Sequence, residues 1–322
     1  MNSINHYREE FLAHLRTSVA VKEPRNLYEP IDYILQLGGK RLRPVLTLVA
    51  TDLFGGDYRK ALPAAAAVEV FHNFSLVHDD IMDNASLRRG KATVHQKWNS
   101  NIAILSGDAM LICAYRLLES YPPDTFAALA KLFSKTALEV CEGQQWDMDF
   151  ETQAQVSIPQ YLQMIRYKTA VLVGAALQMG AIIAGASIEN QRLIYDFGVT
   201  IGLAFQLQDD YLDTFGDEAF GKKIGGDIFE NKKTILYLKA LDLADEAQRN
   251  TLIAQYTTSE ENDAKIAIVT QLFRQTGAAE AVRDEIARTT DEALNLLEHI
   301  TISDENRAYL KQFALELMNR KV

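Results

Sequence analysis

The sequence contains little cysteine and no excess of positive charge, and each shortage excludes a class of protein. Only 2 cysteines occur among 322 residues, Cys113 and Cys141, and both lie in apolar segments with helical periodicity. We therefore expect neither a disulfide framework nor a cysteine-based metal site, and the thiols are typical of a reducing compartment. The formal net charge of −10 argues against a nucleic-acid partner, because binding to DNA depends on a basic surface.

Long apolar runs are also missing. The most apolar span, 170–186, contains glycines and Gln178, and it is shorter than the roughly 18 residues that a membrane-spanning helix needs. Residues 1–10 are polar and lack the apolar core of a targeting signal. The sequence therefore predicts no integral membrane segment and a cytoplasmic protein.

Strand-like alternation of apolar and polar residues is scarce, whereas helical periodicity runs through the whole chain. The sequence predicts an all-α protein with helices over 3–20, 28–37, 40–54, 58–83, 99–120, 123–150, 158–186 and 189–215, and four or five more within 232–322. Polar, basic loops are expected over 84–97 and 217–231. No linker or shift of composition divides the chain, so we expect a single helical domain over residues 1–322.

An acidic pattern, Asp-Asp-x-x-Asp, occurs twice after an apolar run and contributes Asp79, Asp80, Asp83, Asp209, Asp210 and Asp213. In a helix the outer aspartates of each copy share a face, where like charges destabilise the helix. Mg²⁺ prefers oxygen ligands and often combines one or two carboxylates with substrate phosphates. If the two helices face one cavity, the clusters could hold several Mg²⁺ ions and a diphosphate, with Asp80 and Asp210 as supporting or shared ligands. One copy alone could be a solvated acidic face, but the repetition favours a metal site.

Basic residues accompany both acidic clusters. They are Lys40 and Arg43 at a predicted helix start, Arg88 and Arg89 after the first cluster, and Lys222 and Lys232 after the second. Each group alone is compatible with a solvated basic surface. The N-terminus of a helix favours phosphate, however, which supports a phosphate site at Lys40 and Arg43. The other groups follow directly after an acidic cluster, so we expect them to bind phosphate beside the metal ions.

Four further polar residues are candidates for the site, His72, Gln206 and the pair Lys168-Thr169. His72 precedes Asp79 by two helical turns and Gln206 precedes Asp209 by one, so each shares a face with the aspartates. A lone histidine on an apolar helix is more often a core residue, but this alignment favours a site. Lys168-Thr169 precedes an apolar run, where a lysine either extends along the apolar surface to water or meets a diphosphate oxygen.

Motifs for covalent catalysis are absent, since the sequence contains no G-x-S-x-G, no H-E-x-x-H and no cysteine–histidine pairing. Metal ions and arginines around a diphosphate, next to an apolar cavity, suggest heterolysis of a C–O bond. Mg²⁺ would stabilise the departing diphosphate, and apolar walls would keep water from the carbocation.

In this order the motifs resemble those of the trans-isoprenyl diphosphate synthases, or polyprenyl synthetases. The resemblance is carried by Gly38-Gly39-Lys40-Arg41-Leu42-Arg43-Pro44, Asp79-Asp80-Ile81-Met82-Asp83, Arg88-Arg89-Gly90, Lys168-Thr169, Phe205-Gln206 and Asp209-Asp210-Tyr211-Leu212-Asp213. It implies the all-α isoprenoid synthase fold, with a helical bundle around a central cavity, a homodimer, and two or three Mg²⁺ ions per active site. The implied reaction joins an allylic diphosphate (dimethylallyl, geranyl or farnesyl) head to tail with isopentenyl diphosphate and releases diphosphate.

The resemblance also implies roles for single residues. Asp79, Asp83 and Asp209 would ligate Mg²⁺ bound to the allylic diphosphate. Positions that meet this diphosphate match Arg88, Lys168, Lys222 and Lys232, and polar positions along its path match Thr169 and Gln206. The isopentenyl diphosphate site matches Lys40, Arg43, His72 and Arg89. Asn231 precedes Lys232-Lys233 where the family usually has glycine, so either lysine could reach the diphosphate.

Product length is expected to depend on the helix of the first cluster. Ser75 and Phe74 lie four and five residues before Asp79, roughly 6–7.5 Å further along the helix, where an aromatic ring could stop the growing chain. One bulky residue beside one small residue resembles family members that make C20 geranylgeranyl diphosphate. Farnesyl diphosphate is the second expectation.

Two alternatives stay open. A class I terpene cyclase would ordinarily carry an Asn/Ser/Glu-type second metal motif, and it would not need residues 38–44 or Arg89 for a second diphosphate. A non-catalytic partner subunit would be expected to have lost aspartates, and all six are present.

Overall fold

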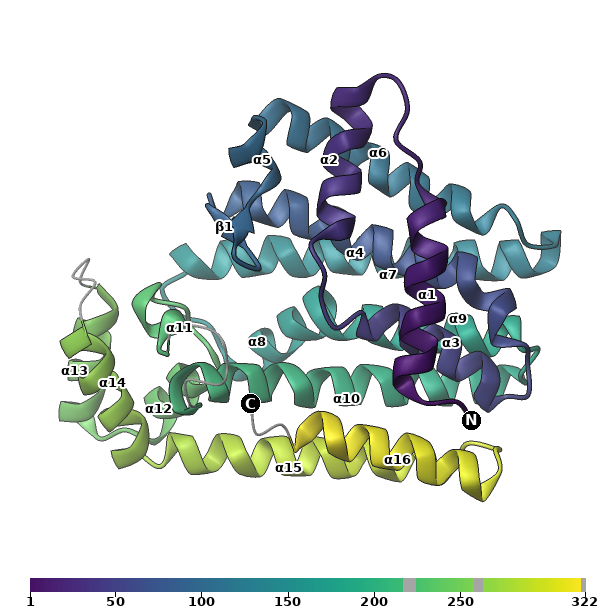
Figure 1. Ribbon diagram of the computed structural model, residues 1–322. Helices are drawn as coiled ribbons and strands as arrows, with labels where there is room; N and C mark the ends of the chain where they lie inside the picture. The colour runs from purple at the N-terminus through teal and green to yellow at the C-terminus, as the bar shows by residue number, and fades with distance from the viewer. Residues whose placement is uncertain (217–223, 258–262, 320–322) are drawn as a thin grey trace. The chain divides into compact units, whose positions relative to one another are not determined.

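Helices make up nearly all regular structure in the residues that the computed structural model describes, 1–216, 224–257 and 263–319 (Figure 1). The contacts divide the chain into two units. Unit 1 comprises Met1–Thr136 and Leu172–Tyr195, and unit 2 comprises Ala137–Val171 and Asp196–Val322. The prediction of an all-α protein is confirmed, whereas a single domain over the whole chain stays a prediction.

Unit 1 is built around one apolar helix, α4 (Leu62–Met82). The other elements of this unit are α1 (Ile4–Ser18), α2 (Arg25–Gln36), α3 (Leu42–Leu53), the 3-10 helix η1 (Tyr58–Ala61), α5 (Val94–Lys97), α6 (Ser100–Leu118), α9 (Val171–Ile183) and the first parts of α7 (Pro123–Thr152) and α10 (Ile188–Phe215). Most residues of α4 from Ala64 to Phe74 are buried, and α1, α2, α3 and α6 pack against this helix. A helix that is apolar on most sides is buried among its neighbours. The acidic cluster thus stands at the C-terminal end of the central helix.

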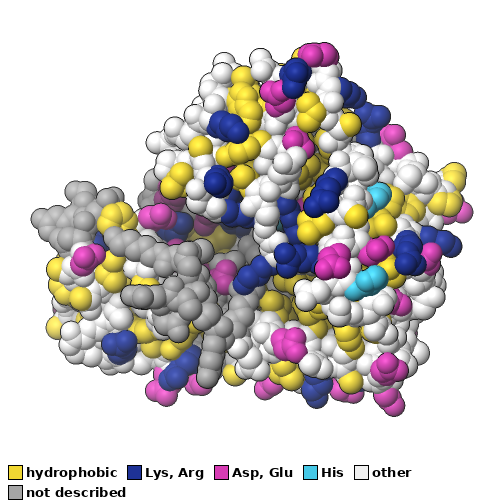
Figure 2. All heavy atoms as spheres, viewed as in Figure 1, with side chains coloured by type: hydrophobic (Ala, Val, Ile, Leu, Met, Phe, Trp, Pro, Cys, Tyr) yellow, Lys and Arg dark blue, Asp and Glu magenta, His cyan; other side chains and the backbone are white. Residues whose placement is uncertain are grey.

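Charged side chains of both signs lie among hydrophobic ones on the face of unit 1 that Figure 2 shows.

A small β-hairpin replaces part of the loop expected over 84–97. Strands β1 (Leu87–Arg88) and β2 (Lys91–Ala92) pair antiparallel, and α5 follows. The two residues between the paired ends of the ladder turn the chain, because Arg89 and Gly90 have φ angles of 53° and 73°. Positive φ at both central positions is the geometry of a two-residue hairpin turn. Strands of two residues are too short to show alternation in the sequence, so the loop prediction was wrong here.

Unit 2 contains the remaining helices. They are the second parts of α7 and α10, α8 (Ile158–Ile165), η2 (Arg166–Ala170), α11 (Gly226–Phe229), α12 (Ile235–Leu243), α13 (Glu246–Thr257), α14 (Asp263–Gln275), α15 (Ala278–Leu297) and α16 (Asp304–Met318). Figure 1 shows α15 and α16 side by side. Buried apolar residues of α12, α14 and α15, among them Leu236, Phe273 and Val282, form a continuous core.

The helix predicted over 158–186 is interrupted by a π-helical turn, η2. The turn packs closely against Gly143 of α7. A Cβ atom built on this glycine would lie 2.2 Å from the backbone nitrogen of Lys168, so no larger residue fits there without a shift. Single π turns of this kind occur mostly inside α-helices and often at functional sites. The prediction of one continuous helix was therefore wrong at the residues that carry Lys168 and Thr169.

By length and composition, one helix among the described residues, α6, could cross a membrane. This is weak support for a membrane span, because core helices of soluble proteins pass the same test. In unit 1, α6 packs along α4 and α2.

Candidate active site

A cluster of arginines surrounds His72 in unit 1. Arg43 donates through Nη1 to His72 Nε2 at 3.3 Å. Burial lowers the pKa of His72 well below its usual value, and the charges of Arg43, Arg89, Arg88 and Arg41 lower it further. A neutral imidazole can accept the hydrogen bond from Arg43. The concentration of guanidinium groups fits an anion of high charge, such as a diphosphate.

The turn before α3 brings this basic cluster together. Gly38 and Gly39 have φ angles of 78° and 123°, which glycine adopts readily. Arg89 donates to the carbonyl of Gly38, and a Cβ atom on Gly39 would lie 2.9 Å from Cζ of Arg89. The turn therefore admits the Arg89 side chain only because a glycine stands there. Three residues predicted for the isopentenyl diphosphate site, Arg43, His72 and Arg89, lie together, and Lys40 is exposed in the same turn.

The first acidic cluster ends α4. Asp80 is buried, and Arg88 donates to it through Nε at 2.8 and 2.9 Å and through Nη2 at 2.6 Å. Burial alone would lower the pKa of Arg88, but the hydrogen bonds and the charge of Asp80 raise it. Asp79 is partly buried, 3.8 Å from Arg88, and Asp83 is exposed. Asp80 thus holds an arginine, which agrees with a supporting role.

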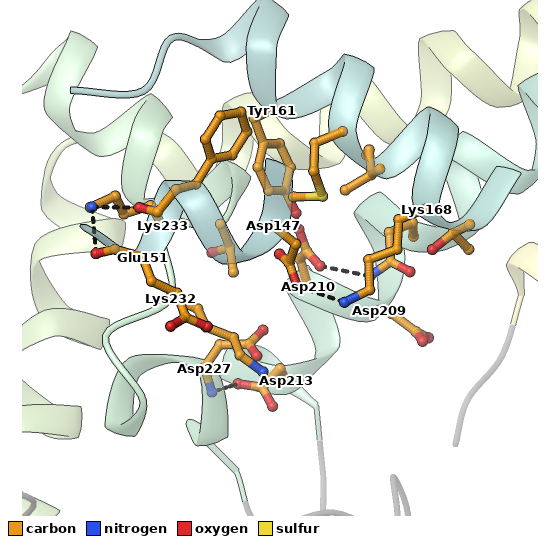
Figure 3. A pocket seen from close by; sticks show the side chains of 16 residues that line it. Asp147, Glu151, Tyr161, Lys168, Asp209, Asp210, Asp213, Asp227, Lys232 and Lys233 are labelled. Carbon is orange, nitrogen blue, oxygen red and sulfur yellow. Dashed lines mark hydrogen bonds and ion pairs between the residues drawn. The ribbon is translucent and has the colours of Figure 1, made fainter. Parts of the chain in front are cut away.

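The second acidic cluster lines a cavity of about 220 Å³ within unit 2 (Figure 3). Its carboxylates come from Asp147, Glu151, Asp209, Asp210, Asp213 and Asp227, and its amines from Lys168, Lys232 and Lys233. Thr169 and Gln206 also line it. The predicted residues of this half of the site are therefore brought together, except Lys222, which lies outside the described residues.

Asp210 and Asp213 are the buried members of this cluster, and Asp210 has two side-chain hydrogen bonds. The Tyr161 hydroxyl donates to it, and Gln206 donates to its Oδ1 at 3.1 Å. Burial and the charge of Asp227 raise the pKa of Asp210 to about 8, although both hydrogen bonds oppose the shift. Asp210 is thus held by side chains of its own unit, as Asp80 is by Arg88.

The two adjacent lysines have different surroundings. Lys233 donates to the carbonyls of Phe150, Glu151 and Gln153 at 2.7, 3.2 and 2.6 Å, and so binds the C-terminal end of α7. Lys232 pairs with Glu230 at 2.7 Å. Burial would lower the pKa of Lys232, but Glu230, Asp227 and Asp147 raise it. Because Lys233 is committed to backbone carbonyls, Lys232 is the better candidate for contact with a ligand.

The π turn η2 carries Lys168 and Thr169 to the cavity wall. Lys168 donates through Nζ to Asp147 Oδ2 at 2.6 Å, as Figure 3 shows. The sequence alone left open whether Lys168 extends to water along apolar surface. The structure places its amine in a carboxylate-rich cavity.

The donor set of the cavity fits a hard divalent cation in its chemistry. All of its acidic side chains are carboxylates, whose oxygens suit such a cation. The pKa of Asp210 is raised first by burial and then by the charge of Asp227, and a cation would offset that charge. Within the part of the chain that the structure describes, no three His, Cys, Asp or Glu side chains are arranged to hold a metal ion. Asp209 and Asp213 therefore offer the right atoms without a preassembled cage, as expected where phosphate oxygens complete the coordination.

Two residues of the site gave no signal in the sequence. Asp147 and Tyr161 come from other helices, and nothing in their spacing connects them with the acidic clusters. Asp227 could have been found, because it follows the second cluster and its backbone N–H donates to Asp213 Oδ2 at 2.9 Å. Asp147 and Tyr161 reach the site through tertiary contacts, which helical periodicity does not predict.

Known proteins resemble the chain over almost its whole length. A family model described as polyprenyl synthetase matches residues 24–273. A short chain isoprenyl diphosphate synthase of Methanothermobacter thermautotrophicus is 36% identical over 321 residues, covering 98% of both chains. A geranylgeranyl pyrophosphate synthase of Geoglobus acetivorans is 38% identical, covering 93% of this chain and 92% of its own. The crystal structure of a geranylgeranyl pyrophosphate synthase is 54% identical, covers 100% of both chains and superimposes with a TM-score of 0.96. The chain therefore belongs to the polyprenyl synthetase family of trans-isoprenyl diphosphate synthases.

Proposed function

We propose that the protein joins an allylic diphosphate head to tail with isopentenyl diphosphate and that geranylgeranyl diphosphate is its main product. The observation that carries the proposal is that each unit holds one group of charged side chains suited to a diphosphate or its metal ions, called a half-site below. Unit 1 gathers arginines around a neutral His72, and unit 2 gathers carboxylates and lysines around one cavity. Relatives named geranylgeranyl diphosphate synthases support the C20 product.

The two diphosphates are assigned to different sets of residues. Isopentenyl diphosphate binds Lys40, Arg43, His72 and Arg89, and the allylic diphosphate meets Arg88, Lys168, Lys222 and Lys232, with Thr169 and Gln206 along its path. Arginine forks bind diphosphate oxygens in pairs and hold the reacting carbons in place. The absence of a base motif from the sequence agrees with proton loss to the released diphosphate.

Two or three Mg²⁺ ions would be held by Asp79, Asp83, Asp209 and Asp213. Bound there, they would stabilise the charge that develops on the departing diphosphate. Asp80 and Asp210 support these ligands from buried positions, through Arg88 and through Tyr161 and Gln206. Whether the two clusters share one set of ions stays a prediction.

Phe74 and Ser75 are proposed to limit product length. The Phe74 ring is buried, with its centroid 5.5 Å from that of Phe71 and 4.8 Å from that of His78. Ser75 donates to the carbonyl of His72 at 2.8 Å. In this proposal the small Ser75 would leave room for the growing chain, and the packed ring of Phe74 would stop it.

The test is incubation of the protein with labelled isopentenyl diphosphate, Mg²⁺ and each allylic primer in turn. We expect linear products that end at C20, and no turnover once EDTA removes the metal. An Asp79→Asn variant should lose activity about 10²-fold or more, since one metal ligand is lost. Cyclic hydrocarbons would establish a terpene cyclase instead, and no turnover with any primer would establish a non-catalytic subunit.

We also propose a cytoplasmic homodimer. Support for the dimer comes from α6, which exposes Leu105 and Ile112 at 60% and 59% on one face of the helix. Large apolar side chains grouped on an exposed face are typical of protein–protein contacts.

A further inference from the structure

A buried ion pair in unit 1 has no role in the assignments above. Arg41 donates through Nη1 to Glu69 and through Nη2 to the carbonyl of Leu35. Asn73 donates through Nδ2 to the Glu69 carboxylate at 2.9 Å and to the Glu69 carbonyl at 2.8 Å. Arg41, Glu69 and Asn73 are 5%, 2% and 0% exposed. Charges withdrawn from water in this way are costly unless they are paired and hydrogen-bonded, and here Nη1 and Nη2 of Arg41 have partners whereas its Nε has none.

One guanidinium group connects three helices. Arg41 immediately precedes α3, Leu35 lies in the last turn of α2, and Glu69 lies in α4. The backbone φ angle of Arg41 is 51°, in the left-handed region that residues other than glycine rarely adopt. The planar guanidinium of arginine donates hydrogen bonds to two acceptors in a fixed geometry. The ammonium group of a lysine, on a flexible stem, does not hold two acceptors in this geometry. The contacts of Arg41 thus fix the backbone of the turn in a conformation that it would not prefer alone.

Each partner of the ion pair is adjacent to groups proposed to bind isopentenyl diphosphate. Arg41 stands between Lys40 and Arg43 in the turn, and His72 stands between Glu69 and Asn73 on α4. Arg43 and His72 meet across these two elements at 3.3 Å. The ion pair therefore joins the turn to the helix beside the place where their ligand-binding side chains converge.

We propose that the Arg41–Glu69 ion pair positions Lys40, Arg43 and His72 for isopentenyl diphosphate. The inference rests on the proposed function of this half-site. A site that is ordered before the substrate arrives does not lose side-chain and loop freedom on binding, so its affinity is higher than that of a loose site. Arg41 and Glu69 act as positioning residues and do not contact the substrate.

Charge and geometry predict opposite effects for one substitution. Glu69→Gln removes a negative charge beside an anion site, so the electrostatic field alone would tighten binding of isopentenyl diphosphate. Loss of the ion pair instead loosens the turn and weakens binding. Arg41→Lys keeps the charge and removes only the fork, so it isolates the geometric effect.

The experiment measures KM and kcat for each substrate separately with the full-length protein. For Glu69→Gln and for Arg41→Lys, we expect KM for isopentenyl diphosphate to rise about tenfold, which is the loss of one charge-assisted hydrogen bond. KM for the allylic diphosphate should change less than about twofold. Arg25→Lys and Glu29→Gln are the matched controls, because this ion pair of 2.7 Å lies on the surface of the same unit. Both controls should behave as the wild type.

A variant that leaves one buried charge unpaired could fail to fold, so a double variant is included. The double variant Arg41→Met with Glu69→Met removes both charges. Replacing a buried ion pair by apolar residues often leaves the stability of a protein unchanged. With a wild-type melting temperature, the double variant should still show the raised KM for isopentenyl diphosphate. Unchanged or lower KM in these variants, or an equal rise for both substrates, would overturn the inference. Failure of the wild type to extend any primer would overturn the proposed function instead.

Discussion

Phe74 illustrates what a single side chain contributes. Its ring belongs to a series of edge contacts in unit 1, since Phe71 packs against Phe133 at 5.2 Å and Phe133 against Tyr115 at 4.8 Å. A ring supported in this way by further rings cannot move aside easily, because protein interiors are close-packed. The floor proposed for the growing chain would therefore have a rigid backing.

Phe74→Ala is expected to lengthen the product beyond C20. Removal of the ring opens space next to α4 and costs about 3–5 kcal/mol of stability, as for other buried aromatic truncations. Chromatography of the products with isopentenyl diphosphate in excess, at a temperature where the variant stays folded, measures the chain length. Phe133→Leu serves as a control for general loosening of the core. A C20 product from folded Phe74→Ala protein would show that Phe74 is not the floor.

Sequence reasoning grouped residues by their spacing along one helix. Asp79 with Asp83, Asp209 with Asp213, and His72 were grouped because periodicity places them on shared faces, and their roles stay predictions. It failed for Arg41 and Glu69, which are distant in the sequence and appear as ordinary surface charges until the fold pairs them. Buried charge pairs are defined by tertiary contact, so no local pattern predicts them.

Among the elements, η2 differs most from its expected form. Residues 158–186 have the composition of a continuous helix, and nothing in this segment indicates a π turn. The close approach of α7 at Gly143 accompanies the turn, and Trp146 of α7 stacks on Tyr167 with centroids 5.3 Å apart. Such a bulge depends on the neighbouring helix, which explains why periodicity missed it.

Gly143→Ala should lower activity although alanine is the better helix former. The gain in helix propensity is about 1 kcal/mol, but overpacking at a contact of 2.2 Å to the backbone costs typically 1–3 kcal/mol. The displaced turn would move Lys168 away from Asp147, and a shift near 1 Å can cost about 10²-fold in rate. Steady-state kcat and the melting temperature measure both effects.

Glu142→Ala is the control for Gly143→Ala, because Glu142 is the exposed neighbour on the same helix. It should leave kcat and the melting temperature near wild type. A more stable Gly143→Ala protein with full activity would mean that η2 does not need the glycine, and the positioning of Lys168 would then require another explanation.

For the molecule as a whole, net charge is a poor guide to the substrate. The total of −10 suggests repulsion of an anion, yet the arginines around His72 create a locally positive site. Acidic residues gathered in the unit 2 cavity account for part of the total and fit a divalent cation. Local fields, rather than the sum of charges, decide which ligands bind.

Self-association is the property of the whole molecule that α6 is expected to control. Leu105 and Ile112 are seven residues apart and share a face, with Ile104 beside them at 44% exposure. A stable dimer buries about 1,600 Å² in total, and exposed apolar side chains near its centre supply much of the affinity. Ile112→Asp would place an unpaired charge in such an interface, at a cost of several kcal/mol.

Sedimentation velocity should give a dimer for the wild type and a monomer for Ile112→Asp. Ile188→Asp, at an apolar residue of the same unit that is 79% exposed, should remain dimeric. If Ile112→Asp sediments as the wild type does, α6 is not the contact face, because a charge tolerated there must still be in water.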